Sequence, residues 1–81
     1  MPATRSQTAA LVGMLRAATG TEPTVHEESQ HVRIEADLPD DLGPAERRAV
    51  LIAIAACPRY GHDRTSKRVT IWAELDKEAH R

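Results

Sequence analysis

The 81-residue chain has no phenylalanine, one tryptophan, one tyrosine and one cysteine. A single cysteine cannot form an internal disulfide, so nothing in the sequence supports an oxidising compartment or a structural zinc site. A domain of this size buries only about 60% of the surface that its unfolded chain exposes. We therefore expect one domain, residues 1–81, with a thin core built from Ala, Leu, Val and Ile.

Long apolar runs are also missing. The longest, Ala49 to Cys57, is far shorter than the roughly 20 residues that a membrane span needs. The apolar residues near the N-terminus are interrupted by polar ones at helical spacing, which does not resemble the core of a signal peptide. We therefore predict a soluble cytoplasmic domain that makes no contact with membranes.

Two helices are predicted. Thr4 to Gln7 matches a capping box, a stripe of apolar side chains follows at helical spacing, and Gly20 is suited to the stop; the stripe consists of Leu11, Met14, Leu15 and Ala18. Pro44 is suited to the first position of a second helix, which Pro58 ends. This second helix is apolar on all sides, so we expect it to be central in the monomer or to meet a second chain.

Three strands are predicted. Residues 31–38 and 68–75 alternate apolar and polar side chains, the pattern of a half-buried strand, and Thr24 to Glu28 is a shorter extended segment that would form a hairpin with 31–38. The predicted fold is α+β in the order helix, strand, strand, helix, strand. Two helices would cover one face of a three-stranded sheet, and a helical crossover would let the second and third strands run parallel. Residues 1–4 and 76–81 are expected to be flexible ends.

Charge is distributed unevenly along the chain. Residues 22–46 hold eight acidic residues against Arg33, whereas residues 47–68 hold six basic residues against Asp63. Such a pattern fits internal ion pairs, self-association or a basic patch for an anionic partner.

Residues 57–68, CPRYGHDRTSKR, are interpreted as an exposed connector between the second helix and the last strand. Basic side chains alternate there with rings that can stack, a pattern that suits an acidic protein surface or a single-stranded nucleic acid. The alternative is a solvated connector that pairs with nearby acids. The candidate binding residues of this segment are Arg59, Tyr60, Arg64, Lys67 and Arg68.

Trp72 is the strongest single candidate for binding. The alternation around it places the indole on the polar face of its strand, where Arg33 of the neighbouring strand could stack on it. A tryptophan at such a position is either covered by its own chain, here the connector or the tail, or contacts a partner.

Signals for catalysis and for cofactors are weak. Cys57 and His62 could form a nucleophile and base, but Cys57 ends an apolar helix face, which favours a structural role. His26 and His31 offer at most two metal ligands across the hairpin, and no glycine-rich phosphate motif occurs. We expect no catalytic residue, metal, cofactor or small-molecule ligand.

These observations lead to three hypotheses of function. The first is a non-enzymatic interaction or regulatory module that binds a protein, or a second copy of itself, through the sheet face around Trp72 and the basic segment 59–68. The second is a nucleic-acid-binding regulator that uses the same residues. The third is a Cys57/His62 enzyme.

Overall fold

The computed structural model describes residues 3–77, with side chains from residue 6 onward, and contains two helices and four strands. The helices are α1 (Ala3–Thr19) and α2 (Pro44–Ala55). The strands are β1 (Thr24–Glu27), β2 (His31–Leu38), β3 (Arg59–Arg64) and β4 (Val69–Asp76). The α+β class is confirmed, whereas the predicted number of strands was one too low.

The helix ends follow the local sequence. Gly20 adopts a left-handed φ of 74° directly after α1, and its amide donates a hydrogen bond to the Arg16 carbonyl at 2.9 Å. Glycine takes this conformation without the steric cost of a Cβ. Pro44 is the first residue of α2, as predicted, and Glu46 lies in its first turn. The predicted capping box depends on the side chain of Thr4, which lies outside the described side chains.

The sheet has the strand order β1-β2-β4-β3, and every neighbouring pair is antiparallel. The predicted parallel pairing of residues 31–38 with the last strand is therefore wrong. Strands β2 and β3 do run parallel across the α2 crossover, but β4 returns from β3 by a tight hairpin and inserts between them. The result is a split βαβ arrangement with a short hairpin strand, β1, added at one edge.

The segment predicted as a connector is mostly strand β3. It pairs with β4 from Arg59 opposite Glu74 to Arg64 opposite Val69. Alternation could not show this strand, because β3 lies at the sheet edge and five of its six residues are exposed, on both faces. A strand with no buried face carries no apolar period.

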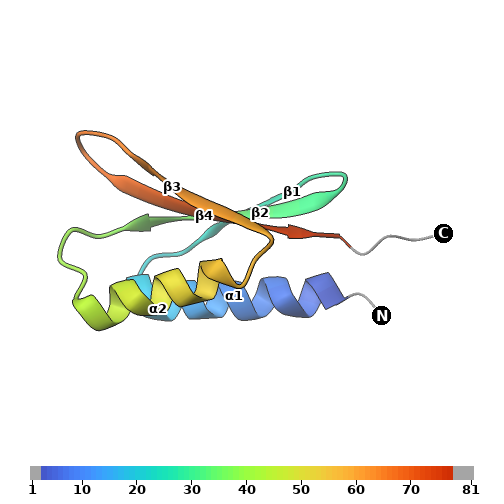
Figure 1. Cartoon of the computed structure of the whole chain (residues 1–81), viewed down its shortest axis with the longest axis horizontal. Helices are drawn as coiled ribbons and strands as arrows, with labels where there is room; N and C mark the ends of the chain where they lie inside the picture. Colours follow the sequence, from blue (N-terminus) through green and yellow to red (C-terminus); the bar gives the residue numbers. More distant parts are fainter. Residues whose placement is uncertain (1–2, 78–81) are drawn as a thin grey trace.

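Both helices lie on one face of the sheet, as predicted (Figure 1). The largest fully buried side chains come from both layers and are Leu15, Ile34, Val50, Ile54 and Ile71.

The apolar stripe of α1 is narrower than predicted, because Met14 is half exposed. Helix α2 is not central in the monomer, since the side chains of Leu51 and Ile52 are 58% and 62% exposed.

The ends of the chain were predicted to be flexible at 1–4 and 76–81. Within the described residues, Ala3 and Thr4 belong to α1 and Asp76 is the last residue of β4. Residues 1–2 and 78–81 lie outside the described residues. Neither helix among residues 3–77 has the length and hydropathy needed to cross a membrane.

Candidate functional site

The open face of the sheet, the one opposite the helices, carries the side chains that alternate with the core residues. It is defined by Thr24 and His26 of β1, His31, Arg33, Glu35 and Asp37 of β2, Arg59, Gly61 and Asp63 of β3, and Thr70, Trp72, Glu74 and Asp76 of β4. Neither helix covers this face (Figure 1). The sheet therefore presents a four-stranded surface that no helix covers.

Trp72 lies at the centre of the open face, between Arg33 and Gly61. The Arg33 guanidinium carbon is 4.4 Å from the centroid of the indole, so the predicted stacking is present. On the other side the indole lies against the backbone of Gly61, its cross-strand partner: a Cβ at Gly61 would stand only 2.8 Å from Cζ2 of the ring. The indole is thus half-buried by its own chain, by strand β3 and Arg33.

Glu74 links the charged residues of three strands. It lies on β4 directly opposite Arg33 of β2 and Arg59 of β3, so one carboxylate is reached from both sides. Arg59 Nε donates to Oε1 at 2.7 Å, and Arg33 Nη1 donates to Oε2 at 3.1 Å. His31 Nε2 is 3.5 Å from the same Oε2. Arg33 also donates from Nε to Glu35 at 2.7 Å, which fixes the guanidinium over the indole.

These contacts change the pKa of the Glu74 carboxyl. The hydrogen bond from Arg59 is the largest cause that holds the pKa of the Glu74 carboxyl below its ordinary value of 4.5, and burial opposes it in part. The hydrogen bonds that Arg59 donates to Asp76 and to Glu74 in turn raise the pKa of Arg59. Both shifts favour the charged forms, so the network is ionic at neutral pH.

Because the folded pKa of Glu74 is lowered, its contribution to stability is present above the ordinary glutamate pKa and is lost as the pH falls through the folded pKa. We expect Glu74→Gln to be less stable than wild type at pH 7 and to lose less stability on acidification below about pH 5. Urea unfolding at neutral and acidic pH measures both effects. Glu28→Gln, at an exposed residue of the β1–β2 turn, is the control and should follow the wild-type pH dependence. Equal pH dependence of Glu74→Gln and wild type would contradict this role.

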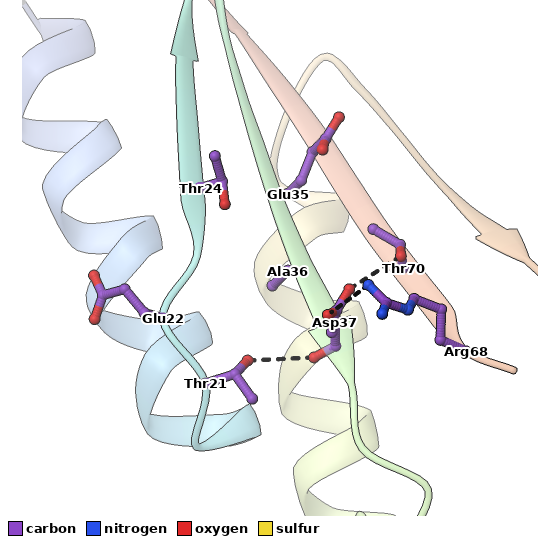
Figure 2. A pocket seen from close by; sticks show the side chains of 8 residues that line it. All are labelled: Thr21, Glu22, Thr24, Glu35, Ala36, Asp37, Arg68 and Thr70. Atoms are coloured by element: carbon purple, nitrogen blue, oxygen red, sulfur yellow. Dashed lines mark hydrogen bonds and ion pairs between the residues drawn. The ribbon is translucent and has the colours of Figure 1, made fainter.

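One end of the open face is hollowed into a pocket of about 300 Å³ beside the end of β2 (Figure 2). Its lining is mainly polar, and its central group, Asp37, already has protein partners. Arg68 Nη1 donates to Oδ2 of Asp37 at 3.3 Å, Thr70 donates to Oδ1 at 3.1 Å, and Thr21 donates to the Asp37 carbonyl at 3.3 Å. A polar hollow whose groups bond to one another lacks the apolar lining of small-molecule sites.

The predicted binding residues fall on two faces. Trp72, Arg33 and Arg59 meet on the open face, and Arg68 joins its end through Asp37. Tyr60 and Arg64 alternate with them along β3 and therefore project toward the helix side of the sheet, both exposed. Lys67 lies in the β3–β4 turn, where its amide donates to Thr65 Oγ1 at 3.2 Å.

The uneven charge is only partly neutralised within the monomer. Among residues 3–77, the ion pair between Arg68 and Asp37 is the only one that joins the basic residues of 47–68 to the acidic residues of 22–46. Arg59 instead pairs with Glu74 and Asp76, on β4. Arg64 and Lys67 make no ion pair within the described part of the chain.

The environment of Cys57 does not favour nucleophilic chemistry. The thiol is 7% exposed, and burial raises its pKa. A nucleophilic cysteine needs the opposite, an accessible site that lowers the pKa. Across residues 3–77, no three His, Cys, Asp or Glu side chains come together in a way that could hold a metal ion.

Glu74 and Gly61 are two residues of this site that the sequence pattern did not single out. Glu74 owes its position to having an arginine directly opposite on each neighbouring strand, and Gly61 owes its contact with Trp72 to the β3–β4 register. Both features require that β3 be recognised as a strand. No signal in the chain could reveal them without that step.

The chain matches no protein-family model, no curated protein and no solved structure. Function therefore has to be inferred from the geometry of the open face and its edges.

Proposed function

We propose that the protein is a non-enzymatic interaction module that binds a protein partner through the open face around Trp72 and through the adjacent β3–β4 turn. The observation that carries this proposal is a half-buried indole at the centre of a sheet face that no helix covers. Tryptophan supplies a large rigid contact area and is enriched among interface residues that dominate affinity. Arg33, stacked on the ring and held by Glu35 and Glu74, adds a fixed polar contact beside it.

The charges of the open face support a protein partner over a nucleic acid. The carboxylates of Glu35, Asp37, Asp63, Glu74 and Asp76 outnumber the guanidinium groups of Arg33, Arg59 and Arg68. A phosphate backbone is bound by a surplus of positive charge, and this face has a surplus of negative charge. The cations of the β3–β4 hairpin that have no ion pair in the described chain, Arg64 and Lys67, lie at the end of that hairpin. A protein surface of mixed charge matches this pattern better.

The test is co-purification of partners with the tagged chain and with two variants, Trp72→Ala and Arg64→Glu. We expect partners captured by wild type to be reduced at least tenfold by Trp72→Ala, because the central contact area is removed, and more weakly by Arg64→Glu. Circular dichroism must first show that both variants are folded.

The matched control is Arg48→Glu, which makes the same charge change at an exposed site of α2 and should retain the partners. Retention of every partner by both Trp72→Ala and Arg64→Glu would contradict the proposal. Partners that disappear only after nuclease treatment would support the nucleic-acid alternative instead.

A further inference from the structure

Strand β3 is a free edge of the sheet. No other strand within residues 3–77 pairs with its outer side. The Thr65 amide donates to the Arg68 carbonyl at 2.8 Å. Thr65 and Arg68, which face each other at the β3–β4 turn, therefore form a hydrogen-bonded pair of the antiparallel ladder. Hydrogen-bonded and non-hydrogen-bonded pairs alternate along an antiparallel ladder, and the β3–β4 register is continuous. The backbone amides and carbonyls of Tyr60, His62 and Arg64 therefore point away from β4, toward the outer side.

We propose that β3 pairs antiparallel with β3 of a second copy of this chain, about a two-fold axis at Gly61. In this register Gly61 faces Gly61, Tyr60 faces His62, and Arg59 faces Asp63, each of the last two contacts occurring twice by symmetry. The groups that point outward, at Tyr60 and His62, form the intermolecular hydrogen bonds. The two sheets join into one of eight strands, an isologous arrangement. This inference deepens the proposed function, on which it rests, by naming a second copy as the partner.

Charge complementarity selects this partner. Asp63 is the one open-face carboxylate without an ion pair or hydrogen bond in the described chain, whereas Glu35, Asp37, Glu74 and Asp76 each have one. The two-fold axis places Arg59 of the other copy directly opposite Asp63, in a non-hydrogen-bonded pair, where side chains lie closest. Arg59 already crosses to Glu74 and Asp76, so the dimer extends an existing ladder of alternating charge.

Neighbouring registers are less complementary. A two-fold axis perpendicular to the sheet keeps the open faces of both copies on the same side. The alternative registers are therefore those in which the axis moves by one residue along β3. An axis at His62 places two imidazoles opposite each other and leaves Asp63 opposite Gly61. An axis at Asp63 opposes two carboxylates, which repel. Only the axis at Gly61 gives opposite charges to both charged positions of the open face.

Because Gly61 has no side chain, the open face at the two-fold axis is left to the two Trp72 indoles, one from each copy. Each Trp72 indole lies over its own Gly61, so the two rings approach the axis from opposite sides. The two copies of β4 are three strand spacings apart, about 14 Å. The rings fill much of this space, and pairing is expected to shield them from water.

The test is sedimentation equilibrium of the purified chain over a micromolar to millimolar dilution series, with amide hydrogen exchange at both ends of the series. We expect a weak monomer–dimer equilibrium, because a short strand edge buries less area than a standard interface. Protection of the Tyr60 and His62 amides should rise with concentration. Asp63→Arg, which places like charges opposite each other twice, should raise the dissociation constant at least about tenfold. His62→Pro, which removes an outward amide without removing a bond to β4, should abolish the dimer.

Arg48→Glu is the matched control, since it reverses a charge at an exposed site of α2, away from β3. Its dissociation constant should change less than about threefold, within the range of a peripheral contact. The proposal is overturned if wild type stays monomeric over the whole concentration series. It is also overturned if the dimer survives Asp63→Arg but is disrupted by Ile52→Glu, because that result would place the interface on α2. Protection of Tyr60 and His62 only on addition of another protein would also overturn self-pairing. A monomeric chain whose captured partners still depend on Trp72 would leave the proposed function standing.

Discussion

Replacing Ile34 with alanine is expected to lower the free energy of unfolding by about 2–5 kcal/mol. Ile34 is 0% exposed on the central strand β2, opposite Ala73 of β4, and belongs to one buried cluster with residues of both helices. Small core residues such as Ala36 and Ala73 cannot move to fill the cavity that the substitution leaves. Because a chain of this length has a total stability of only about 4–12 kcal/mol, the variant should lose a large fraction of it and unfold at a clearly lower urea concentration.

The matched control is Ile52→Ala, the same substitution at a side chain that is 62% exposed on α2. It should change the free energy of unfolding by no more than about 0.5 kcal/mol. Urea unfolding followed by circular dichroism measures both variants. Equal losses in the two variants would show that the core is not where this fold places it.

Replacing Gly61 with alanine is expected to destabilise the fold by about 1–3 kcal/mol, the usual range for overpacking. The added Cβ would lie 2.8 Å from Cζ2 of Trp72 and 3.0 Å from Cε2 and Nε1, so the indole must move. Its displacement also disturbs the stacking of Arg33, worth about 0.5–1 kcal/mol at an exposed site. Trp72 emission should shift to the red in the folded variant.

A double-mutant cycle isolates this contact. In a Trp72→Ala background the obstruction is gone, so Gly61→Ala should become neutral or slightly stabilising, because alanine restricts the unfolded chain. Gly13→Ala in α1 is the second control: an added Cβ there meets nothing within 4 Å, and the change should stabilise by about 0.4–1 kcal/mol. A loss at Gly61 that persists without Trp72 would contradict the indole contact.

The parts of the fold with one buried face were predictable from the sequence. Alternation located β2 with its observed bounds and β4 to within a residue at each end, and Gly20 and Pro44 marked helix boundaries. These signals are local consequences of burial and backbone geometry. Strand β3 has no buried face, so its sequence, RYGHDR, predicted a connector, and the errors in the strand count, the order of elements and the pairing of the last strand followed from that.

The candidate site was predictable in part for the same reason. The position of Trp72 on the polar face and its stacking with Arg33 depend on β2 and β4, both recognised from alternation. The roles of Gly61 and Glu74 depend on β3, and so does the assignment of Tyr60 and Arg64 to the opposite face from Arg59. A pattern that reports burial cannot report contacts made by an exposed edge strand.

Trp72 is the only tryptophan, so its emission reports directly on the open face. The most direct measurement is this emission over a protein dilution series, and then with a single-stranded oligonucleotide at low and high salt. Binding of a second copy beside this face predicts a blue-shifted signal at high concentration that moves to the red on dilution and does not respond to the oligonucleotide. A signal that is constant on dilution and is quenched by the oligonucleotide only at low salt would contradict the proposed function and favour binding of nucleic acid.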